Sequence, residues 1–469
     1  MTERTKRIVG YTLWGVLLAG LIAAAVLAGS ANARAREYER RLSAAYERSL
    51  AELAVNVGDI ATSLKKTQVV AGERQYALLL SEIWRTSGEA ASNLGQLPAG
   101  FARAAQTSAF LTQTSDFAHV LLQKVTDATP ITAADMQQLY ALAQSAEGLS
   151  AELQGLERRS EALADDLLSY DYYSAYDSAD GEGGGAPTPA GENGGTNSNA
   201  EQSGAQSQGK YPTLIYDGPF SESTSKAEPL GLTGEAVTEA AAMARAAEFL
   251  GSTLAGALTP TGAQNGRIPT YGFTGKTAGG RQIDIDITQT GGHCLSMRIT
   301  GGAPANTARP DEARGKELAQ IGQDYLAARG LTSMESTYAQ YYGGDAVINY
   351  ACVQDGVLLY SDLIKVWVNV QSGEVTGVEA TNYYMSHLPR ELPAPTVTQE
   401  QAAYALSTAV QVESVRMALI PLTLQDERLC YEFKCTFDGD YYIVYVNALT
   451  GMEEQVFLVL DSESGQLVV

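Results

Sequence analysis

Histidine, cysteine and tryptophan are scarce in this chain, which has three, four and three of them among 469 residues. Metal centres and acid–base catalysis in proteins depend most often on histidine and cysteine. The cysteines form no CxxC pair, and Cys430 and Cys435 fall on opposite faces of one expected strand. We therefore expect four ordinary small apolar cysteines, with no disulfide framework and no metal centre.

Basic residues are also few. The chain has 32 Lys and Arg against 54 Asp and Glu, a formal net charge of −22, which argues against sequence-independent binding to nucleic acid. It contains no HExxH, GxSxG, Walker loop or dinucleotide-binding glycine pattern. His119, His293 and His387 lie in three different segments, and Asp284 and Asp286 are interpreted as solvent-facing charges on a strand. We expect no catalytic residues and no cofactor, and therefore no enzyme.

One long apolar run is present, IVGYTLWGVLLAGLIAAAVLAG at residues 8–29. These 22 uncharged residues suffice for a helix that spans a bilayer. Arg4, Lys6 and Arg7 precede the run and predict a cytoplasmic N-terminus. A signal peptide cleaved near residues 31–33 is the alternative, although its apolar region would be unusually long. Both interpretations place the rest of the chain outside the cytoplasm.

Apolar residues recur at steps of three and four after this run, which is the pattern of helices packed on helices. One such stripe consists of Tyr46, Leu50, Leu53, Val57, Ile60 and Leu64. Breaks near Gly72, at residues 95–98 and at Pro130 divide the segment into about four long helices. A near capping box is expected to start the last helix at Thr132. We predict an antiparallel helical bundle over residues 37–177.

Residues 178–210 contain no Val, Ile, Leu, Met or aromatic residue. Such a segment cannot bury enough apolar surface to fold, so it is predicted to be a disordered linker open to proteases. The following residues 211–230 form a lead-in segment with two open interpretations, a strand packed on the next domain or a docking peptide. Its candidate partner-contact residues are Tyr211, Leu214, Ile215, Tyr216 and Phe220.

A strand–turn–strand pattern occurs three times in the C-terminal half. KVWVNVQSGEVTGV at residues 365–378 alternates apolar and polar residues on both sides of Gly373, which predicts a β-hairpin. YIVYVNALTGMEEQV at 442–456 repeats it around Gly451, and IDIDITQTGGHCLSM at 283–297 is a fainter copy around Gly292. A spacing of 81 and 78 residues between the glycines suits a small α+β module rather than a solenoid turn.

Each copy is expected to begin with a helix and to continue as an antiparallel meander, which places three modules at 231–302, 309–385 and 396–469. The first helix is predicted over Gly234 to Leu250, with Val237, Ala240, Ala244 and Ala247 on its buried face. The second is predicted over Asp311 to Arg329, with Leu318, Ile321, Tyr325 and Ala328 facing the sheet. A capping box at Thr398 opens the third. The predicted fold class is α+β multidomain.

The strand–turn units that contain Ser372-Gly373 and Thr450-Gly451 resemble PepSY modules, although Gly291-Gly292 stands in this place in the first copy. The layout as a whole, with its anchor, the helix EYERRLSAAYERSLAELAVNVGDIATSLKK, the segment YPTLIYDGPFS and the tandem modules, resembles the YpeB family of spore germination proteins.

The resemblance implies a non-enzymatic, single-pass protein of the spore inner membrane that faces the cortex. Its implied partner is the cortex-lytic enzyme SleB, which it would hold, stabilise and keep inactive in the dormant spore until a germination protease cuts the chain. An extracytoplasmic protease inhibitor or propeptide-like regulator remains the alternative, because PepSY modules are associated with that role. An envelope hydrolase is a third hypothesis.

Overall fold

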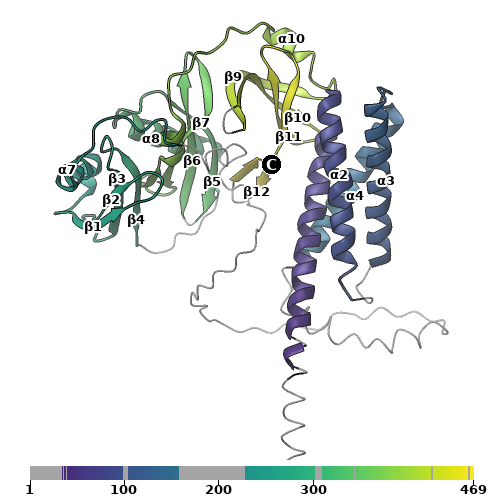
Figure 1. Ribbon diagram of the computed structural model, residues 1–469, viewed down its shortest axis with the longest axis horizontal. Helices are drawn as coiled ribbons and strands as arrows, with labels where there is room; N and C mark the ends of the chain where they lie inside the picture. Colours follow the sequence, from purple (N-terminus) through teal and green to yellow (C-terminus); the bar gives the residue numbers. More distant parts are fainter. Residues whose placement is uncertain are drawn as a thin grey trace, which may run out of the picture. The chain divides into compact units, whose positions relative to one another are not determined.

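The computed structural model describes residues 34, 36–38, 40–98, 104–157, 228–301, 309–342, 344–423, 426–462 and 465–468. The chain divides into a helical unit, residues 1–65 and 77–207, and a sheet unit, residues 66–76 and 208–469 (Figure 1). The predicted anchor, the predicted linker and the five candidate partner-contact residues lie outside the described residues. Among the described residues, none of the helices combines the length and the apolar character needed to cross a membrane.

Four long helices occur in the described N-terminal part, as the stripe pattern predicts. They cover residues 40–67, α2 (Glu73–Leu94), α3 (Ala104–Thr126) and α4 (Ala133–Glu157). The predicted stripe on the first helix is buried from Leu50 to Leu64. At the start of α4 the amide of Asp135 donates to Thr132 Oγ1 at 3.2 Å, and the amide of Thr132 donates to Asp135 Oδ2 at 2.8 Å. This confirms the capping box, which satisfies two amides that the helix itself leaves unpaired.

The sheet unit contains one continuous sheet of the described strands. In chain order they are β1 (Thr259–Gln264), β2 (Thr270–Lys276), β3 (Gln282–Thr288), β4 (Cys294–Thr300), β5 (Met334–Tyr342), β6 (Asp345–Gln354), β7 (Val357–Asn369), β8 (Val375–Glu379), β9 (Gln411–Thr423), β10 (Asp426–Phe437), β11 (Asp440–Asn447), β12 (Glu453–Ser462) and β13 (Gly465–Val468). The order across the sheet is β1-β2-β3-β4-β8-β7-β6-β5-β13-β12-β11-β10-β9. A helical N-terminal region followed by a sheet-rich C-terminal region confirms the α+β class.

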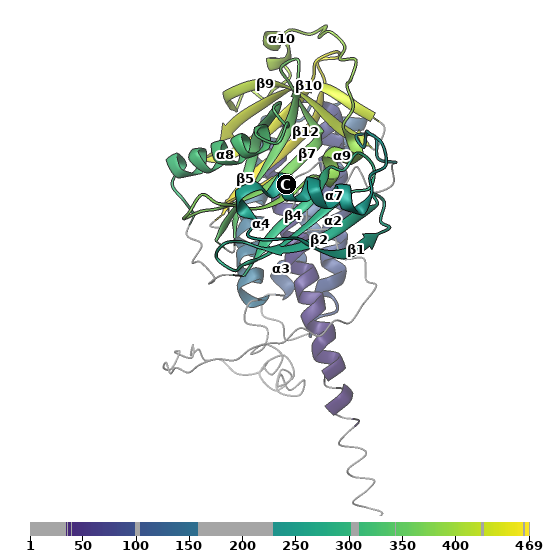
Figure 2. The same ribbon diagram turned by 90° about the vertical axis from the view of Figure 1, so that its left-hand side faces the viewer.

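The helices of the sheet unit are α7 (Glu239–Leu250), the short 3₁₀ turn η2 (Gly251–Thr253), α8 (Glu312–Ala327), α9 (Thr381–Ser386) and α10 (Gln399–Ala403). Two of them cover the sheet, because α7 packs on β2 and β3 and α8 packs on β5 to β8 (Figure 2). Gly322 lets α8 approach β6 closely, since a Cβ there would meet the Tyr350 hydroxyl. That hydroxyl donates to the carbonyl of Ala319 at 2.7 Å.

The predicted helix faces were partly wrong. α7 begins at Glu239, five residues later than expected, and buries Ala242, Ala246 and Leu250 instead of the predicted set. α8 buries Leu318 as predicted, but with Gly322 and Leu326. In such Ala-rich helices several stripes are equally apolar, so the position of the sheet decides which one is buried. The capping box of α10 is confirmed at Thr398, yet this helix has only five residues.

The three glycine turns share one hairpin register. Ile285 pairs with Met297 in the first hairpin, Val366 with Val378 in the second and Val444 with Val456 in the third. In each hairpin an irregularity follows one residue later, after the pairs Asp286↔Ser296, Trp367↔Gly377 and Tyr445↔Gln455. Gly292, Gly373 and Gly451 have φ of 63°, 73° and 73°, a region that favours glycine.

Two predictions about the strands were wrong. The first strand of the hairpin predicted at residues 365–378 is longer than expected, because β7 begins at Val357 and runs through Ser361 and Asp362. Both of these polar residues are buried and have hydrogen-bonding partners. Strands β5 and β9 were not foreseen, because charged residues interrupt their apolar pattern and Pro421 lies within β9.

The strands of the second and third hairpins close into a ring, which the sequence did not predict. Antiparallel pairing runs from β7 through β6, β5, β13, β12, β11 and β10 to β9. β9 then pairs with β7 in parallel, with Leu358 opposite Ala418. β7 makes this closure possible because its C-terminal half pairs with β8 and its N-terminal half with β9.

Candidate functional site

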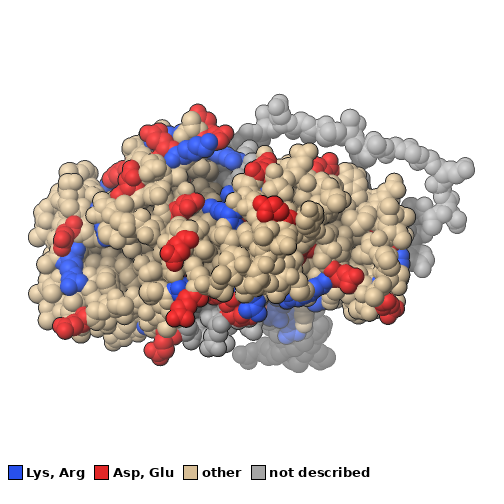
Figure 3. All heavy atoms as spheres, turned by 90° about the horizontal axis from the view of Figure 1, so that it is seen from above, with Lys and Arg blue, Asp and Glu red and all other residues tan. Residues whose placement is uncertain are grey.

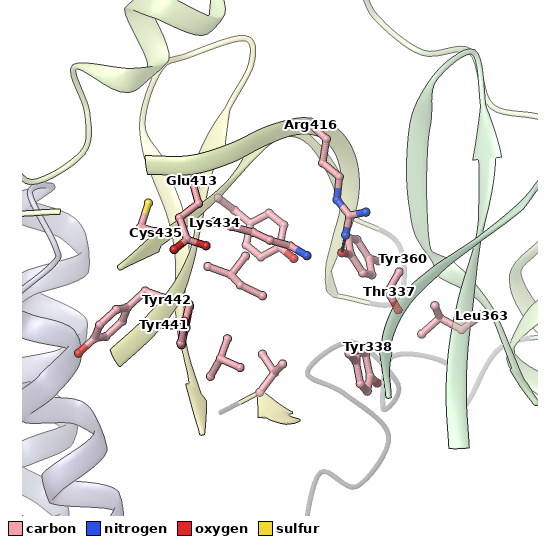
Figure 4. A pocket seen from close by; sticks show the side chains of 14 residues that line it. Thr337, Tyr338, Tyr360, Leu363, Glu413, Arg416, Lys434, Cys435, Tyr441 and Tyr442 are labelled. Atoms are coloured by element: carbon pink, nitrogen blue, oxygen red, sulfur yellow. Dashed lines mark hydrogen bonds between the residues drawn. The ribbon is translucent and has the colours of Figure 1, made fainter. Parts of the chain in front are cut away.

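A cavity of about 250 Å³ lies inside the ring of strands, lined from β5 and β7 on one side and from β9 to β13 on the other (Figure 4). Its wall is mixed in character. Apolar side chains are contributed by Leu363, Ile443, Val459 and Val468. Charged and hydroxyl-bearing side chains are contributed by Glu413, Arg416, Lys434, Thr337, Tyr338, Tyr360, Tyr441, Tyr442 and Tyr445. Concave sites of this mixed composition commonly bind ligands.

A buried carboxylate organises one side of the cavity. Glu432 of β10 has no exposed surface and accepts three hydrogen bonds. Tyr360 Oη donates at 2.5 Å, Tyr445 Oη at 2.8 Å and Arg416 Nε at 2.6 Å. The guanidinium also donates through Nη2 to Tyr360 Oη at 2.9 Å. A carboxylate removed from water needs this degree of pairing, so the network holds the aromatic rings and the guanidinium in fixed positions.

The electrostatics of this network follow from burial and charge. Burial raises the pKa of the Tyr360 and Tyr445 hydroxyls, and the negative charge of Glu432 raises them further, so both stay protonated donors. Burial opposes the charge of Arg416, but Tyr360 and Glu432 hold its pKa above its usual value. The sequence signal for this site was one acidic and one basic residue, Glu432 and Lys434, within the mostly apolar run LCYEFKC, and it was missed.

Cys435, which also lines the cavity, is not an activated nucleophile. Burial raises the pKa of its thiol to about 12, so it is protonated at neutral pH. None of the described residues that line the cavity is a histidine. The described lining therefore offers hydrogen-bond donors, charges and apolar surface for binding rather than a nucleophile paired with a base.

A second buried cluster lies near the chain that joins α9 to α10. Asp362 of β7 has no exposed surface and accepts from Arg390 Nη1 at 2.6 Å and Nη2 at 2.8 Å. His387 Nδ1 contacts the same carboxylate at 2.7 Å. Arg390 also bridges to Glu427 of β10, with Nη2 at 3.0 Å from Oε1. This cluster therefore ties β7 to β10 through the connecting segment.

Cys352, Asp362 and His387 are the described residues that could hold a metal ion, because their ligand atoms lie within 4.8 Å of one another. The charges of Arg390 and His387 favour an ion network over a metal site in this cluster. Both Asp362 oxygens accept from Arg390, and hydrogen bonding to Asp362 and then Cys352 raises the pKa of His387 to about 9. A protonated imidazole cannot be a ligand, so an ion network describes this cluster better than a metal centre.

The residues that the sequence singled out lie apart. Asp284 and Asp286 sit half-exposed on β3, where Gln282 Nε2 donates to Asp284 and Ser296 Oγ donates to Asp286. His119 lies 4.6 Å from the Trp84 ring, and His293 stacks on Tyr384 at 5.1 Å between ring centroids. On the face drawn in Figure 3, acidic and basic side chains are interspersed among wide uncharged areas.

Three family models match this chain and together span most of it. The one described as "YpeB sporulation, PepSY1 and PepSY2 domains" matches residues 200–393. "YpeB N-terminal" matches residues 34–163, and "Peptidase propeptide and YPEB domain" matches residues 396–452.

Similar proteins carry the same family name. Sporulation protein YpeB of Oceanobacillus iheyensis is 25% identical over 449 residues, covering 94% of this chain and 95% of that protein. Sporulation protein YpeB of Bacillus subtilis is 25% identical over 421 residues, covering 89% and 90%. Among solved structures, the Bacillus megaterium YpeB C-terminal domain matches with a TM-score of 0.43 and 26% identity, covering 48% of this chain and 99% of that one.

Proposed function

The chain belongs to the YpeB family of sporulation proteins, and from this we propose that it is a non-enzymatic regulator of spore germination. In this proposal it holds and stabilises the cortex-lytic enzyme SleB in the dormant spore and keeps it inactive. Release follows when a germination protease cuts the chain, and residues 178–210 are the expected place.

The observation that carries the proposal is the cavity inside the ring of strands. Its described lining presents tyrosine rings, a guanidinium and an ammonium group on a rigid framework. Tyrosine and arginine are enriched where proteins bind one another, because they bury a large area and still make directed hydrogen bonds. The protonated Cys435 thiol and the absence of histidine from this described lining support a binding role.

The tandem modules and the apolar N-terminal run supply the rest of the proposal. The common register of the hairpins around Gly292, Gly373 and Gly451 supports three tandem PepSY-type modules, at 231–302, 309–385 and 396–469. The apolar run at residues 8–29 supports a single membrane anchor with a cytoplasmic N-terminus. We place the remaining chain outside the cytoplasm, at the spore inner membrane, where the lead-in segment at 211–230 is a further proposed partner contact.

Replacing tyrosines at the cavity tests this function. Tyr338 and Tyr441 line the cavity, and Tyr441 is 47% exposed, so a partner can reach it. The double variant Tyr338→Ala/Tyr441→Ala is expected to lower the amount of SleB retained in dormant spores at least tenfold, as measured by immunoblotting. Tyr404→Ala is the matched control, because Tyr404 is 86% exposed and does not line the cavity. Equal SleB levels in both strains would refute the proposed function.

A propeptide-like protease inhibitor is the second candidate. It is supported by the family description "Peptidase propeptide and YPEB domain", which matches residues 396–452. Cleavage rates of extracytoplasmic proteases measured with and without the full-length chain separate the two candidates. Inhibition that persists in Tyr338→Ala/Tyr441→Ala would favour this second function over the first.

A further inference from the structure

Lys434 is a partly buried cation at the cavity wall whose ammonium group makes no direct ion pair with a described residue. It lies on β10, two residues after Glu432, and lines the cavity. Within the described part of the chain, its ammonium group makes no hydrogen bond and no ion pair. Burial lowers the pKa of Lys434, and the neighbouring Arg416 lowers it further. A charged group held away from water without a partner costs free energy, so this position calls for an anion.

The carboxylates nearby do not fill this place. Glu432 already accepts from Tyr360, Tyr445 and Arg416. Glu335 lies 3.4 Å from Arg416 instead. Glu432, Glu335 and Glu413 raise the pKa of Lys434 through their charges, but none of these three forms an ion pair with the ammonium group. Arg416 is engaged by Glu432, Glu335 and Tyr360, so Lys434 is the cation of the described lining that remains for a ligand, and a single ammonium group suits a monoanion better than a dianion.

The apolar residues of the cavity wall indicate the character of the rest of the ligand. Leu363, Ile443, Val459 and Val468 provide apolar surface beside the charged groups. A volume of about 250 Å³ is below the range of sites for drug-sized molecules, which begins at roughly 300 Å³, so the occupant is about the size of one amino acid.

We propose that the cavity binds a carboxylate group carried on a small apolar body, with the carboxylate at Lys434. This deepens the proposed function and rests on it for its biological meaning, since such a group can be the end of a partner's chain. The same chemistry is also present in a free N-acylated amino acid.

Isothermal titration calorimetry of the full-length chain in detergent tests the chemistry. N-acetylphenylalanine is compared with its neutral amide, and binding of the acid is expected to be at least tenfold tighter. Lys434→Met should weaken binding of the acid at least tenfold, whereas Lys434→Arg should retain it because the positive charge remains. Lys276→Met is the matched control, since Lys276 is exposed on β2 and does not line the cavity.

The possible results of these experiments distinguish the carboxylate site from the proposed function. Equal affinities of the acid and the amide, or unchanged affinity in Lys434→Met, would overturn the inference without affecting the proposed function. Inorganic phosphate binding as tightly as the acid would overturn the choice of a carboxylate. A hexapeptide that ends in phenylalanine with a free carboxylate tests whether the natural ligand is a chain end or a free amino acid derivative. If the hexapeptide binds more tightly than N-acetylphenylalanine, the cavity is assigned to a chain end. If Lys434→Met abolishes acid binding while SleB stays fully retained in spores, the carboxylate site stands but is not the contact that retains SleB.

Discussion

Replacing Arg390 by methionine tests how burial changes the stability that is lost when an ion pair is broken. Arg390 Nη1 lies 2.6 Å from Asp362, and the Asp362 side chain has no exposed surface. Lys316 Nζ also lies 2.6 Å from a carboxylate, that of Glu312, but these side chains are 77% and 83% exposed. The two pairs share a distance and differ in solvent access, so Lys316→Met is a matched control.

The expected loss of unfolding free energy depends on which partners Asp362 keeps in Arg390→Met. Arg390→Met removes two of the donors to Asp362 and leaves His387 in contact with a carboxylate that water does not reach. Breaking a buried pair by removing one partner costs about 3–5 kcal/mol. Because the protonated His387 stays, we expect a loss of about 3 kcal/mol in the free energy of unfolding. Lys316→Met is expected to cause no measurable change, since water screens an exposed pair.

Denaturation in urea, followed by tryptophan fluorescence, measures this difference. The chain has three tryptophans, and Trp367 lies in β7, five residues after Asp362. With Trp14 and Trp84 replaced by phenylalanine, the signal of the full-length chain reports the sheet unit alone. Asp362→Asn combined with Arg390→Met should be less destabilising than Arg390→Met alone, because no unpaired charge is left buried. If Arg390→Met costs no more than Lys316→Met, the reasoning is wrong.

Two further predictions concern pH and packing in the same fluorescence assay and by circular dichroism. The pKa of His387 is raised to about 9, so its contribution to stability is complete below the unfolded value of about 6.5 and is lost as pH rises through 9. Unfolding free energies measured from pH 6 to pH 10 should therefore fall in the wild type and change less in His387→Gln; parallel curves would contradict the assignment. Gly322→Ala should cost about 1–3 kcal/mol, because its Cβ would meet the Tyr350 ring and hydroxyl. Gly148→Ala, in the open interior of α4, should instead stabilise the helical unit by about 0.5–1 kcal/mol; the same sign of change in both variants would refute the packing argument.

Local patterns were sufficient where the deciding interaction lies within a few residues. The capping boxes at Thr132 and Thr398 were predicted because their partners are three residues away. The three hairpins could be aligned because each turn needs a glycine with positive φ at the same place in an alternating strand. The stripe from Leu50 to Leu64 is buried as predicted, since a regular helix brings every third or fourth residue to one face.

Local patterns failed where residues meet from distant parts of the chain. The burial of Asp362 in β7 was not predicted, because its partners His387 and Arg390 lie 25 and 28 positions further along the chain. The short helix α10 begins where its sequence predicts, but its length was not predicted, because the strand β9 follows soon after.

The sequence by itself determined the helical and sheet-rich halves, the repeated turns and the helix caps, because short-range periodicity and backbone geometry specify them. Only the tertiary structure decided that β9 returns to β7 and encloses a cavity. It also decided that Glu432 is fully paired while Lys434, two residues later, is not. The reason is physical: the cost of a charge depends on how much water and which opposite charges surround it, and both are set by strands far apart in the chain.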